Sequence, residues 1–557
     1  VRRPTLGRSM PQRSGVPARS PNFPQQRHQQ QLQQQEPQRR QQQQRRVRPS
    51  SACLGLAAAA LATGALRQRR IRTGRHLRRR RAPEAGACRS QLTSLRASAS
   101  ESRAEEASAV AAHIEEVGVG DYQYQQVLML ACFFFAEAAE LDVISPLTTA
   151  WRLEWALVSD QVALLASVGY AGFAIGTLLS GLLGDSFGRR VPVLVGYVGV
   201  LIGSVGMWAS AGPLAVGVFR GLTGLAVGIG VPASLAMIAE IGPSASRSSL
   251  VLICYAALVL GALYADLGLW FFLPDLATGD WRSLCLFSAL PAAIALPIGL
   301  AELEDTPSFF SMRGDSASLE RVLSKMSLKN GRPDVVWKAP QQPLLSLEQP
   351  PQTEIGFDVT ALRASAVPLA ACSVLDFSYN FVGFGCGYFF PLIIKELAEG
   401  APIPPVGSLV LASLLGFPAL FIAYSLVNSQ LGNRQILAAA GGIEACAGCL
   451  LFSQGSYGPV LGIFLLKLTM LTFSQTVNTV KGALFPSEIR VSALSVSGTC
   501  GRVGALLAPA IIEKTRGEAG SPGEFSVFLG ALVLVVSVAT TLGVAFLPET
   551  KGQRLPD

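Results

Sequence analysis

The sequence predicts an all-α membrane protein whose twelve transmembrane helices form two bundles of six, preceded by a disordered basic N-terminal region. Half of the 557 residues are hydrophobic and only 15% are charged, and the mean hydropathy of +0.39 exceeds that of ordinary soluble proteins. Apolar runs of near-membrane length recur from about residue 126 to residue 547. Similar short motifs also recur about 243 residues apart, which indicates two related halves.

The N-terminal region, residues 1–120, is expected to be a disordered Gln/Arg-rich tail or a targeting leader. Residues 1–100 hold 22 Arg, no Lys and two acidic residues, a charge of +20, so the remainder carries −11 of the total of +9. Ala52–Leu66 is apolar but short for a span, and an Arg/Ser-rich, acid-poor stretch follows it. A cleaved plastid-type leader, a cytoplasmic tail and a gene-model artefact all remain open. Nucleic acid is not an expected partner, because the basic charge is confined to this region.

Twelve apolar segments of about 20 residues follow, and each is long enough to cross a bilayer. A polar linker at 303–363 separates the two bundles, 121–302 and 364–550, and it contains a predicted amphipathic helix at Ser316–Met326; a short tail, 551–557, ends the chain. The predicted spans are 126–147, 161–183, 191–210, 214–238, 248–273, 282–302, 364–394, 405–427, 435–453, 458–480, 491–512 and 525–547.

Two pairs of motifs support the internal repeat. Pro243 and Arg247 after the fourth span match Pro486 and Arg490 after the tenth at an offset of 243. Gly188 and Arg190 match Gly432 and Arg434 at an offset of 244. The second copy is degraded, since Ser429 stands where the first half has Asp185.

The short loops fix the orientation of the predicted spans. Basic residues occur in the loops after spans two, four, eight and ten and in the C-terminal tail, whereas the loop after span five holds Asp275 and Asp280. Because basic loops stay on the cytoplasmic side, both termini are expected in the cytoplasm or the equivalent compartment of an organelle. The protein is therefore expected in the plasma membrane or in an organelle membrane such as that of a plastid or vesicle.

The loop GLLGDSFGRR, between spans two and three, is the most distinctive motif. Its glycines are expected to let two helices and a tight turn approach closely, and its charged residues to form a cytoplasmic cluster that holds one conformation. The alternative is simple anchoring by positive charge. The predicted gating residues are Gly181, Asp185, Gly188, Arg189, Arg190, Glu240, Arg247, Arg490 and Arg502.

Ionisable residues inside the predicted spans indicate a binding site, because each costs about 2.5–3.5 kcal/mol at mid-membrane on insertion scales. Glu137 and Glu140 in the first span are three residues apart and are expected to share one helix face, where their repulsion suits a proton carrier. Asp142 follows them, and solvation near the membrane surface is the alternative for this acidic group. Arg220, in a glycine-rich fourth span, is expected to face a carboxylate.

The second half contributes further candidates for binding substrate or coupling ion. Asp376 lies in a glycine-broken seventh span rich in aromatic and amide groups, which suits a midplane site, although ordinary aromatic packing is the alternative. Glu444 and Lys467 are expected to pair with one another or with substrate. The candidates in this half are Asp376, Phe377, Tyr379, Asn380, Glu444 and Lys467.

Enzyme chemistry has no visible basis in the sequence. The three histidines, His28, His76 and His113, all lie outside the predicted spans, and neither a phosphate-binding loop nor a dinucleotide fingerprint occurs. The pair Cys446 and Cys449 lies in an apolar stretch and is interpreted as helix packing. We therefore expect no catalytic residues, no metal and no cofactor.

The loop motif resembles the loop 2–3 signature of the major facilitator superfamily. The segments AEAAELDVISPL, FRGLTGLAVGIGVPASLAMIAEIGP, LLKLTMLTFSQTVNTVKGALFPSEIR and LPETKG extend the resemblance over about 120–557, to the synaptic vesicle two-related proteins and their organic-ion, niacin and aromatic-acid transporter relatives. Ala483 stands where these relatives commonly have glutamate, so the second half departs from the pattern. The seventh span also lacks the paired glutamines of sugar porters, and the fifth span lacks the glutamine that sugar porters have there.

The resemblance implies a monomeric secondary transporter that binds a small organic solute between the two bundles, near the bilayer midplane. The acidic bias of the spans favours an organic cation or a proton-coupled organic anion, with Glu137 or Glu140 as the carrier of the coupling proton. A sugar porter-like facilitator and a non-transporting, transporter-like receptor remain the alternatives.

Overall fold

The computed structural model describes residues 105–276, 278–339, 365–397, 404–427, 429–453, 457–485, 487–518 and 522–550. The chain divides into two compact units, Val1–Thr93 and Ser94–Asp557, and all described residues belong to the second unit. The predicted leader at 1–100, most of the Pro/Gln-rich part of the linker and the tail at 551–557 lie outside the described residues.

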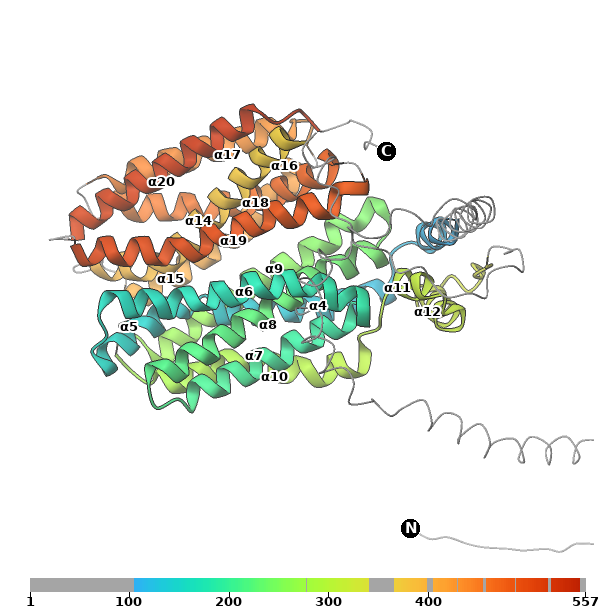
Figure 1. Ribbon diagram of the computed structural model, residues 1–557, viewed down its shortest axis with the longest axis horizontal. Helices are drawn as coiled ribbons and strands as arrows, with labels where there is room; N and C mark the ends of the chain where they lie inside the picture. The colour runs from blue at the N-terminus through green and yellow to red at the C-terminus, as the bar shows by residue number, and fades with distance from the viewer. Residues whose placement is uncertain are drawn as a thin grey trace, which may run out of the picture. The chain divides into compact units, whose positions relative to one another are not determined.

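Every regular element in the described part of the chain is helical, which confirms the predicted all-α class (Figure 1). Helices of the first half lie alongside one another, and so do those of the second half. The first half comprises α4 (Asp121–Leu141), α5 (Ile144–Trp155), α6 (Ser159–Phe187), α7 (Arg190–Trp208), α8 (Pro213–Ile241), the short η2 (Ser244–Ser246), α9 (Arg247–Phe272) and α10 (Trp281–Glu302). The second comprises α14 (Ala366–Leu397), α15 (Pro405–Leu414), α16 (Gly416–Val427), α17 (Asn433–Leu451), α18 (Tyr457–Leu484), α19 (Ser487–Glu518) and α20 (Pro522–Ala545).

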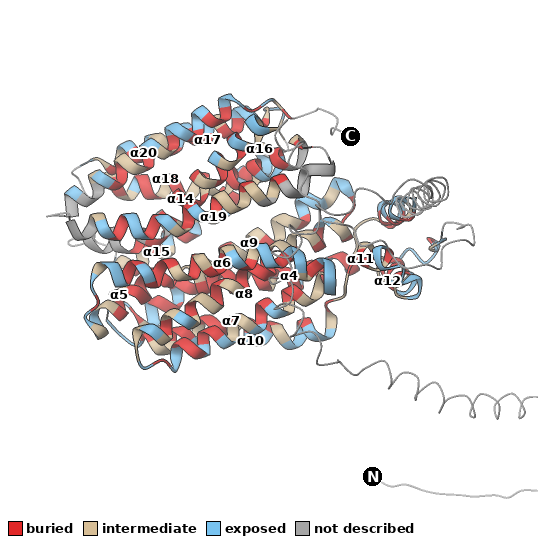
Figure 2. Cartoon of the chain, viewed as in Figure 1, coloured by how far each residue is buried: buried red, intermediate tan, exposed pale blue. Residues whose placement is uncertain are grey.

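Ten segments of the described chain are long and apolar enough to cross a membrane. The other two predicted spans correspond to α4 with α5 and to α19, which carry ionisable side chains such as Glu137, Glu140 and Arg502. Buried and exposed residues alternate along the helices, so each helix packs one side against its neighbours (Figure 2).

Two of the predicted spans are broken into helix pairs. The first is interrupted at Asp142 and Val143, between α4 and α5, and the eighth at Leu415, between α15 and α16. Pro146 and Pro418 explain the breaks, because proline has no N–H to donate to the carbonyl four residues earlier. The first break places Asp142 at a helix end, where the sequence predicted a continuous span.

Small residues bring α6 and α8 close together, as the glycines of the fourth span predicted. A Cβ atom at Gly224 would lie 1.9 Å from the Gly169 carbonyl oxygen, and one at Gly228 would lie 2.2 Å from that of Phe173. Only glycine permits this approach, so the two helices form one rigid unit that carries Arg220.

A small group of helices lies outside the spans. Helix α11 (Pro307–Arg313) and helix α12 (Ser316–Lys329) occupy the linker, and α12 coincides with the predicted amphipathic helix. A further helix covers residues 105–117, so the ordered chain begins earlier than the predicted boundary at 120. Its apolar side chains pack on α12, with Val110 and Ile114 contacting the cluster that contains Leu323.

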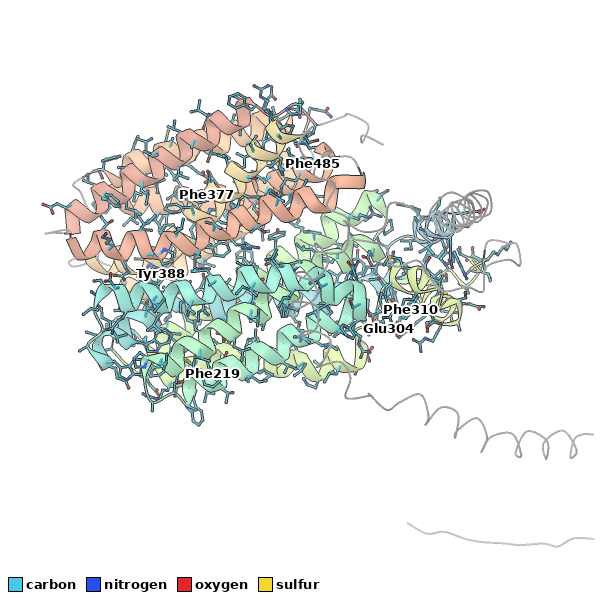
Figure 3. The ribbon with its side chains drawn as sticks, in the orientation of Figure 1. Phe219, Glu304, Phe310, Phe377, Tyr388 and Phe485 are labelled. Atoms are coloured by element: carbon cyan, nitrogen blue, oxygen red, sulfur yellow. The ribbon has the colours of Figure 1, made fainter. Side chains whose placement is uncertain are left out.

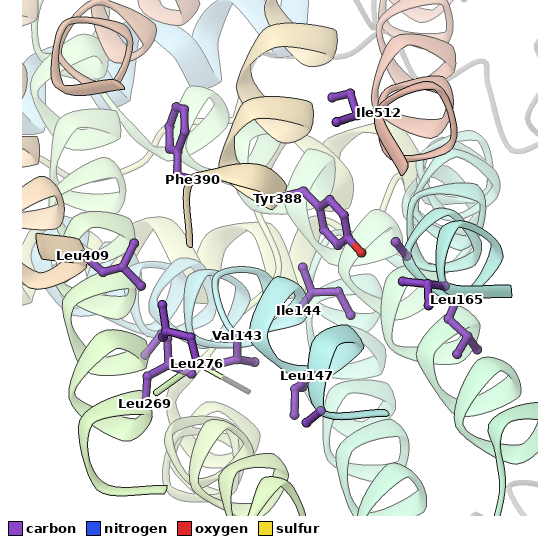
Figure 4. Close-up of a cluster of buried hydrophobic side chains, with 14 of the residues drawn as sticks. Val143, Ile144, Leu147, Leu165, Leu269, Leu276, Tyr388, Phe390, Leu409 and Ile512 are labelled. Carbon is purple, nitrogen blue, oxygen red and sulfur yellow. The ribbon is translucent and has the colours of Figure 1, made fainter. Parts of the chain in front are cut away.

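The two halves meet through α5, α6 and α9 of the first and α14, α15, α16 and α19 of the second. A single apolar cluster crosses this boundary at the ends of the helices that lie away from α11 and α12 (Figures 3 and 4). We call this end the outer end. The cluster contains Ile144, Leu165 and Leu269 from the first half and Tyr388 and Ile512 from the second.

Candidate functional site

A cavity of about 210 Å³ lies between the two halves. Its walls are mainly apolar and aromatic, with a few charged side chains, which is the usual character of a site for a small molecule. The charged and tyrosine side chains of its lining are Glu137, Asp142, Tyr170, Tyr255, Tyr379, Tyr388 and Lys467.

Glu137 and Arg502 come from opposite halves and attract one another, although they form no ion pair within 4.0 Å among the described residues. Glu137 on α4 is buried and interacts electrostatically with Arg502 on α19. Arg502 donates a hydrogen bond of 2.6 Å to Asn380 Oδ1 on α14, and its guanidinium lies 4.0 Å above the ring of Phe173. Since Glu137 Oε2 is buried without a hydrogen-bond partner among the described residues, this carboxylate is available to a proton or a ligand.

Glu140 belongs to a separate group inside the first half. Its Oε1 accepts hydrogen bonds from Ser204 Oγ at 2.6 Å and from Ser288 Oγ at 2.7 Å. Arg220 on α8 interacts with it electrostatically, as the sequence predicted for this arginine. The two carboxylates therefore lie in different environments: Glu137 lines the cavity, whereas Glu140 is held by the two serines inside the first half.

Asp376 does not face the cavity. It forms a buried ion pair with Lys481 on α18, whose Nζ lies 2.8 Å from Oδ1 and 2.9 Å from Oδ2. The sequence placed Lys481 in the loop after span ten, but α18 continues to Leu484 and carries the lysine within the bundle. The prediction of Asp376 as a cavity residue is therefore corrected: this pair holds α14 against α18.

The aromatic candidates of α14 divide between two environments. Tyr379 lines the cavity and stacks on Phe473, with ring centroids 6.2 Å apart. Phe377 stacks on Phe381 at 5.7 Å and packs against Gly504 of α19, away from the cavity. Ordinary packing, one of the two interpretations of this stretch, thus describes Phe377 but not Tyr379.

Glu444 and Lys467 do not form an ion pair within the described residues. Glu444 is buried on α17, whereas Lys467 lines the cavity 6.0 Å from the ring centroid of Phe390. Lys467 interacts electrostatically with Asp142 and with Asp266 on α9. Asp266 was missed in the sequence, although a single acid in an otherwise apolar span is the signal that would have found it.

The loop between α6 and α7 forms the expected charge cluster. Arg189 Nη1 lies 2.6 Å from Asp185 Oδ1, and its Nε lies 3.2 Å from Glu240 Oε1 at the end of α8. Burial disfavours the charge on Arg189, but Glu240 and Asp185 raise its pKa overall. Thr306 donates to the other oxygen of Glu240, so the cluster ties α6, α7 and α8 to the start of α11.

Gly188 and Arg190 fix the turn itself. Gly188 has a φ of +93°, and a Cβ atom there would lie 2.4 Å from Asp305 Oδ1. That same oxygen accepts a 2.8 Å hydrogen bond from the Arg190 amide, and the Arg190 side chain donates to the Leu300 carbonyl. Gly181 has open space at its Cβ position, so its expected role in close packing is corrected.

The second half repeats this turn with altered charges. Glu549 accepts hydrogen bonds from the amides of Asn433 and Arg434, and the Arg434 side chain donates to the Ala545 carbonyl. Glu549 lies 244 residues after Asp305, the offset found for the loop motifs. Asn433 replaces Arg189, so the second turn keeps the backbone contacts of the first but lacks its Asp–Arg–Glu cluster.

Two predicted gating residues, Arg247 and Arg502, lie outside the cluster at Arg189. Arg247 donates to the Gly242 carbonyl within its own turn, and Arg502 belongs to the group at Glu137. The side chain of Arg490 lies outside the described residues. Within the described residues, Cys446 and Cys449 are free and exposed, and no group of three or more metal-ligating side chains occurs.

Comparison with known proteins matches the second compact unit of the chain and not the first. The profile of the sugar (and other) transporter family matches residues 97–557. The chain belongs to this family. The protein is therefore a transporter of the major facilitator superfamily, and the matched region includes all of the described residues.

Individual relatives are distant in sequence, but each aligns with about four-fifths of this chain. The transporter is 25% identical over 473 residues to the synaptic vesicle 2-related protein of Xenopus laevis, covering 80% of this chain and 81% of the relative. It is 23% identical over 451 residues to the niacin transporter NiaP of Acinetobacter baylyi, covering 79% and 98%. Its fold is similar to the partially occluded inward-open xylose transporter XylE from E. coli, with a TM-score of 0.61, 17% identity and coverage of 78% and 100%.

These findings identify a multi-pass integral membrane transporter and not an enzyme. The predicted superfamily and fold class are confirmed. The family and the fold do not specify the substrate, because a sequence relative is named for niacin and a protein of similar fold is named for xylose.

Proposed function

We propose that the chain is a secondary active transporter of a small organic ion, coupled to protons and working by alternating access. The observation that carries the proposal is the buried Glu137 of the first half, which lines the cavity with one carboxylate oxygen unpartnered among the described residues and is attracted by Arg502 of the second half. A change in the charge of either residue alters how strongly the halves attract one another, and so links binding to movement.

The charges around the cavity favour an ion over a neutral sugar. Glu137, Asp142 and Lys467 line it, and the remaining lining is largely apolar or aromatic. No Asn or Gln, the amide side chains that commonly hydrogen-bond sugar hydroxyls, occurs in the described lining. Aromatic faces and acidic groups suit organic cations, and Lys467 offers a contact for an anionic group.

Glu137 is the proposed coupling residue, and Glu140 the second candidate. Glu137 borders the cavity and has an oxygen without a partner, whereas Glu140 accepts two hydrogen bonds from serines. We expect the functional unit to be a monomer, because the two halves of a single chain form the whole cavity.

Uptake into proteoliposomes tests the proposal. Purified wild-type protein is assayed against a panel of organic cations, organic anions and sugars, with and without an inward proton gradient. We expect accumulation of an ion that depends on the gradient, and its loss in the double variant Glu137→Gln, Glu140→Gln. Gradient-driven accumulation by this variant would refute coupling at these residues, and sugar uptake alone would favour the facilitator.

A further inference from the structure

Asp266 is a buried acid that the proposed Glu137 mechanism does not use. It lies on α9 in the outer part of the bundle, and its side chain is 4% exposed. Its Oδ2 has no hydrogen-bond partner among the described residues. Ser413 of α15 lies beside it across the boundary between the halves, but the Ser413 hydroxyl also lacks hydrogen-bonding geometry to any described partner.

Two charged groups act on Asp266, and they come from opposite halves. Asp142, at the break between α4 and α5, belongs to the first half, and Lys467 on α18 belongs to the second. No ion pair within 4.0 Å joins Lys467 to either aspartate among the described residues. The lysine therefore attracts both carboxylates from a distance, across the cavity that Asp142 and Lys467 line, but it offsets only one of their two charges.

Other charged groups near α9 are engaged elsewhere. Helices α15 and α16 contain no Asp, Glu, Lys or Arg. On α10, Arg282 pairs with Glu154 at the outer surface, and on α8, Arg220 faces Glu140. On α4, Glu137 faces Arg502. The local charge at Asp266 is thus set by Asp142, Asp266 and Lys467, which we call the outer triad.

The outer triad is one positive charge short of neutrality when all three groups are ionised. A net negative charge enclosed in an apolar site is costly, because burial disfavours a charge without a partner. One proton on the aspartates would make the triad neutral. We propose that the outer triad binds a proton, on Asp266 Oδ2, and that this proton allows the two halves to close at their outer end.

The outer end is closed in this structure by polar contacts between the two halves. Thr148 and Tyr388 share a hydrogen bond of 2.8 Å between α5 and α14. Arg152 Nη1 lies 3.5 Å from Glu513 Oε2 between α5 and α19. When these contacts part, water reaches Asp266 and supplies the proton; when they form, the proton is enclosed and leaves later through the cavity.

This inference rests on the proposed alternating access, but its test needs no substrate. Hydrogen–deuterium exchange is measured on the full chain in lipid nanodiscs at pH 7.5 and pH 5.5, corrected for the pH dependence of intrinsic exchange. Peptides from α5 (Ile144–Trp155) and α15 (Pro405–Leu414) report opening of the outer end. One linked proton changes the opening equilibrium by at most about tenfold per pH unit.

Wild-type protein is expected to exchange more slowly in these peptides at pH 5.5. Asp266→Asn, which mimics the protonated acid, should lose the part of this pH dependence that Asp266 contributes, and any part that remains should disappear when Glu137→Gln is added. Lys467→Met leaves two negative charges, so it should be less protected than wild type at pH 7.5 and should recover only in part at pH 5.5. The two variants therefore move in opposite directions at pH 7.5. Asp160→Asn, an exposed acid at the start of α6, is the matched control and should follow wild type.

Two results would overturn the proposal: an Asp266→Asn protein that keeps the wild-type pH dependence, or variants of Asp266 and Lys467 that change protection in the same direction. Failure of the proposed transport function would instead appear as an absence of uptake for every compound, with the exchange pattern intact.

Discussion

Lys481 Nζ lies 2.8 Å from Asp376 Oδ1, and both side chains are more than nine-tenths buried. The pair joins α18 to α14 inside the second half. An ion pair in this environment is weak evidence for net stabilisation, but loss of one partner leaves a buried charge that nothing neutralises.

Removal of one member of this pair should therefore harm the protein more than removal of both. Asp376→Asn or Lys481→Met alone is expected to lower the free energy of unfolding by about 3–5 kcal/mol, and the double variant by less than either. Thermal unfolding in detergent measures the three variants. Breaking the half-exposed pair of Glu154 and Arg282 is the control and should cost less than about 1 kcal/mol. Equal, additive losses at Asp376 and Lys481 would contradict the expectation.

The spans, their order and the internal repeat could be predicted from the sequence, because each depends on local composition. Apolar length predicts a span, and the offset of Gly188 from Gly432 predicts related turns. The structure extends this repeat to Asp305 and Glu549, which were not recognised because the motif there is short.

The partners of the charged residues could not be predicted from the sequence. Glu137 and Glu140 are three residues apart, yet one faces Arg502 and the other Arg220. Such pairings depend on which helices pack together, and this information is spread over hundreds of residues. Lys481 shows the same limit. The predicted end of span ten was four residues too early, so the sequence placed in a loop a lysine that is buried and pairs with Asp376.

The asymmetry of the two turns predicts unequal effects of mutation. Asp185→Asn removes a charge-assisted hydrogen bond to Arg189, but the Asp185 side chain is 56% exposed and solvent screens the pair, so the bond contributes about 1 kcal/mol or less. Because the cluster at Arg189 is proposed to stabilise one transport conformation, uptake should fall by up to about fivefold. Ser429→Ala removes a hydroxyl that donates to the Leu426 carbonyl and accepts from the Leu431 amide, both within its own turn, and should be nearly silent. Equal losses in the two variants would show that the second turn also gates transport.

Gly188→Ala tests the geometry of the first turn. The positive φ of Gly188 and the nearby Asp305 carboxylate both oppose a side chain, so we expect a loss of about 1–3 kcal/mol or more in stability. Gly181→Ala is the matched control, because open space surrounds its Cβ position, and stability should change by less than about 1 kcal/mol. Thermal unfolding and uptake are measured for both. A silent Gly188→Ala would show that the turn can rearrange.

His113, which lies outside the spans, should make the packing of its helix on α12 depend on pH. It lies in the helix at 105–117, contacts Ser327 of α12, and stands edge-on to Trp337. Burial lowers its pKa below the ordinary value of 6.5, and Glu116 opposes this shift only in part. The unfolded histidine therefore binds a proton more readily than the packed one.

The packing of this helix on α12 should be strongest above pH 6.5 and should weaken as the pH falls below that value. After correction for the pH dependence of intrinsic exchange, hydrogen–deuterium exchange at 105–117 should accelerate on acidification in wild type and much less in His113→Phe, with α7 as the internal reference. An identical acceleration in both proteins would assign the effect to another group.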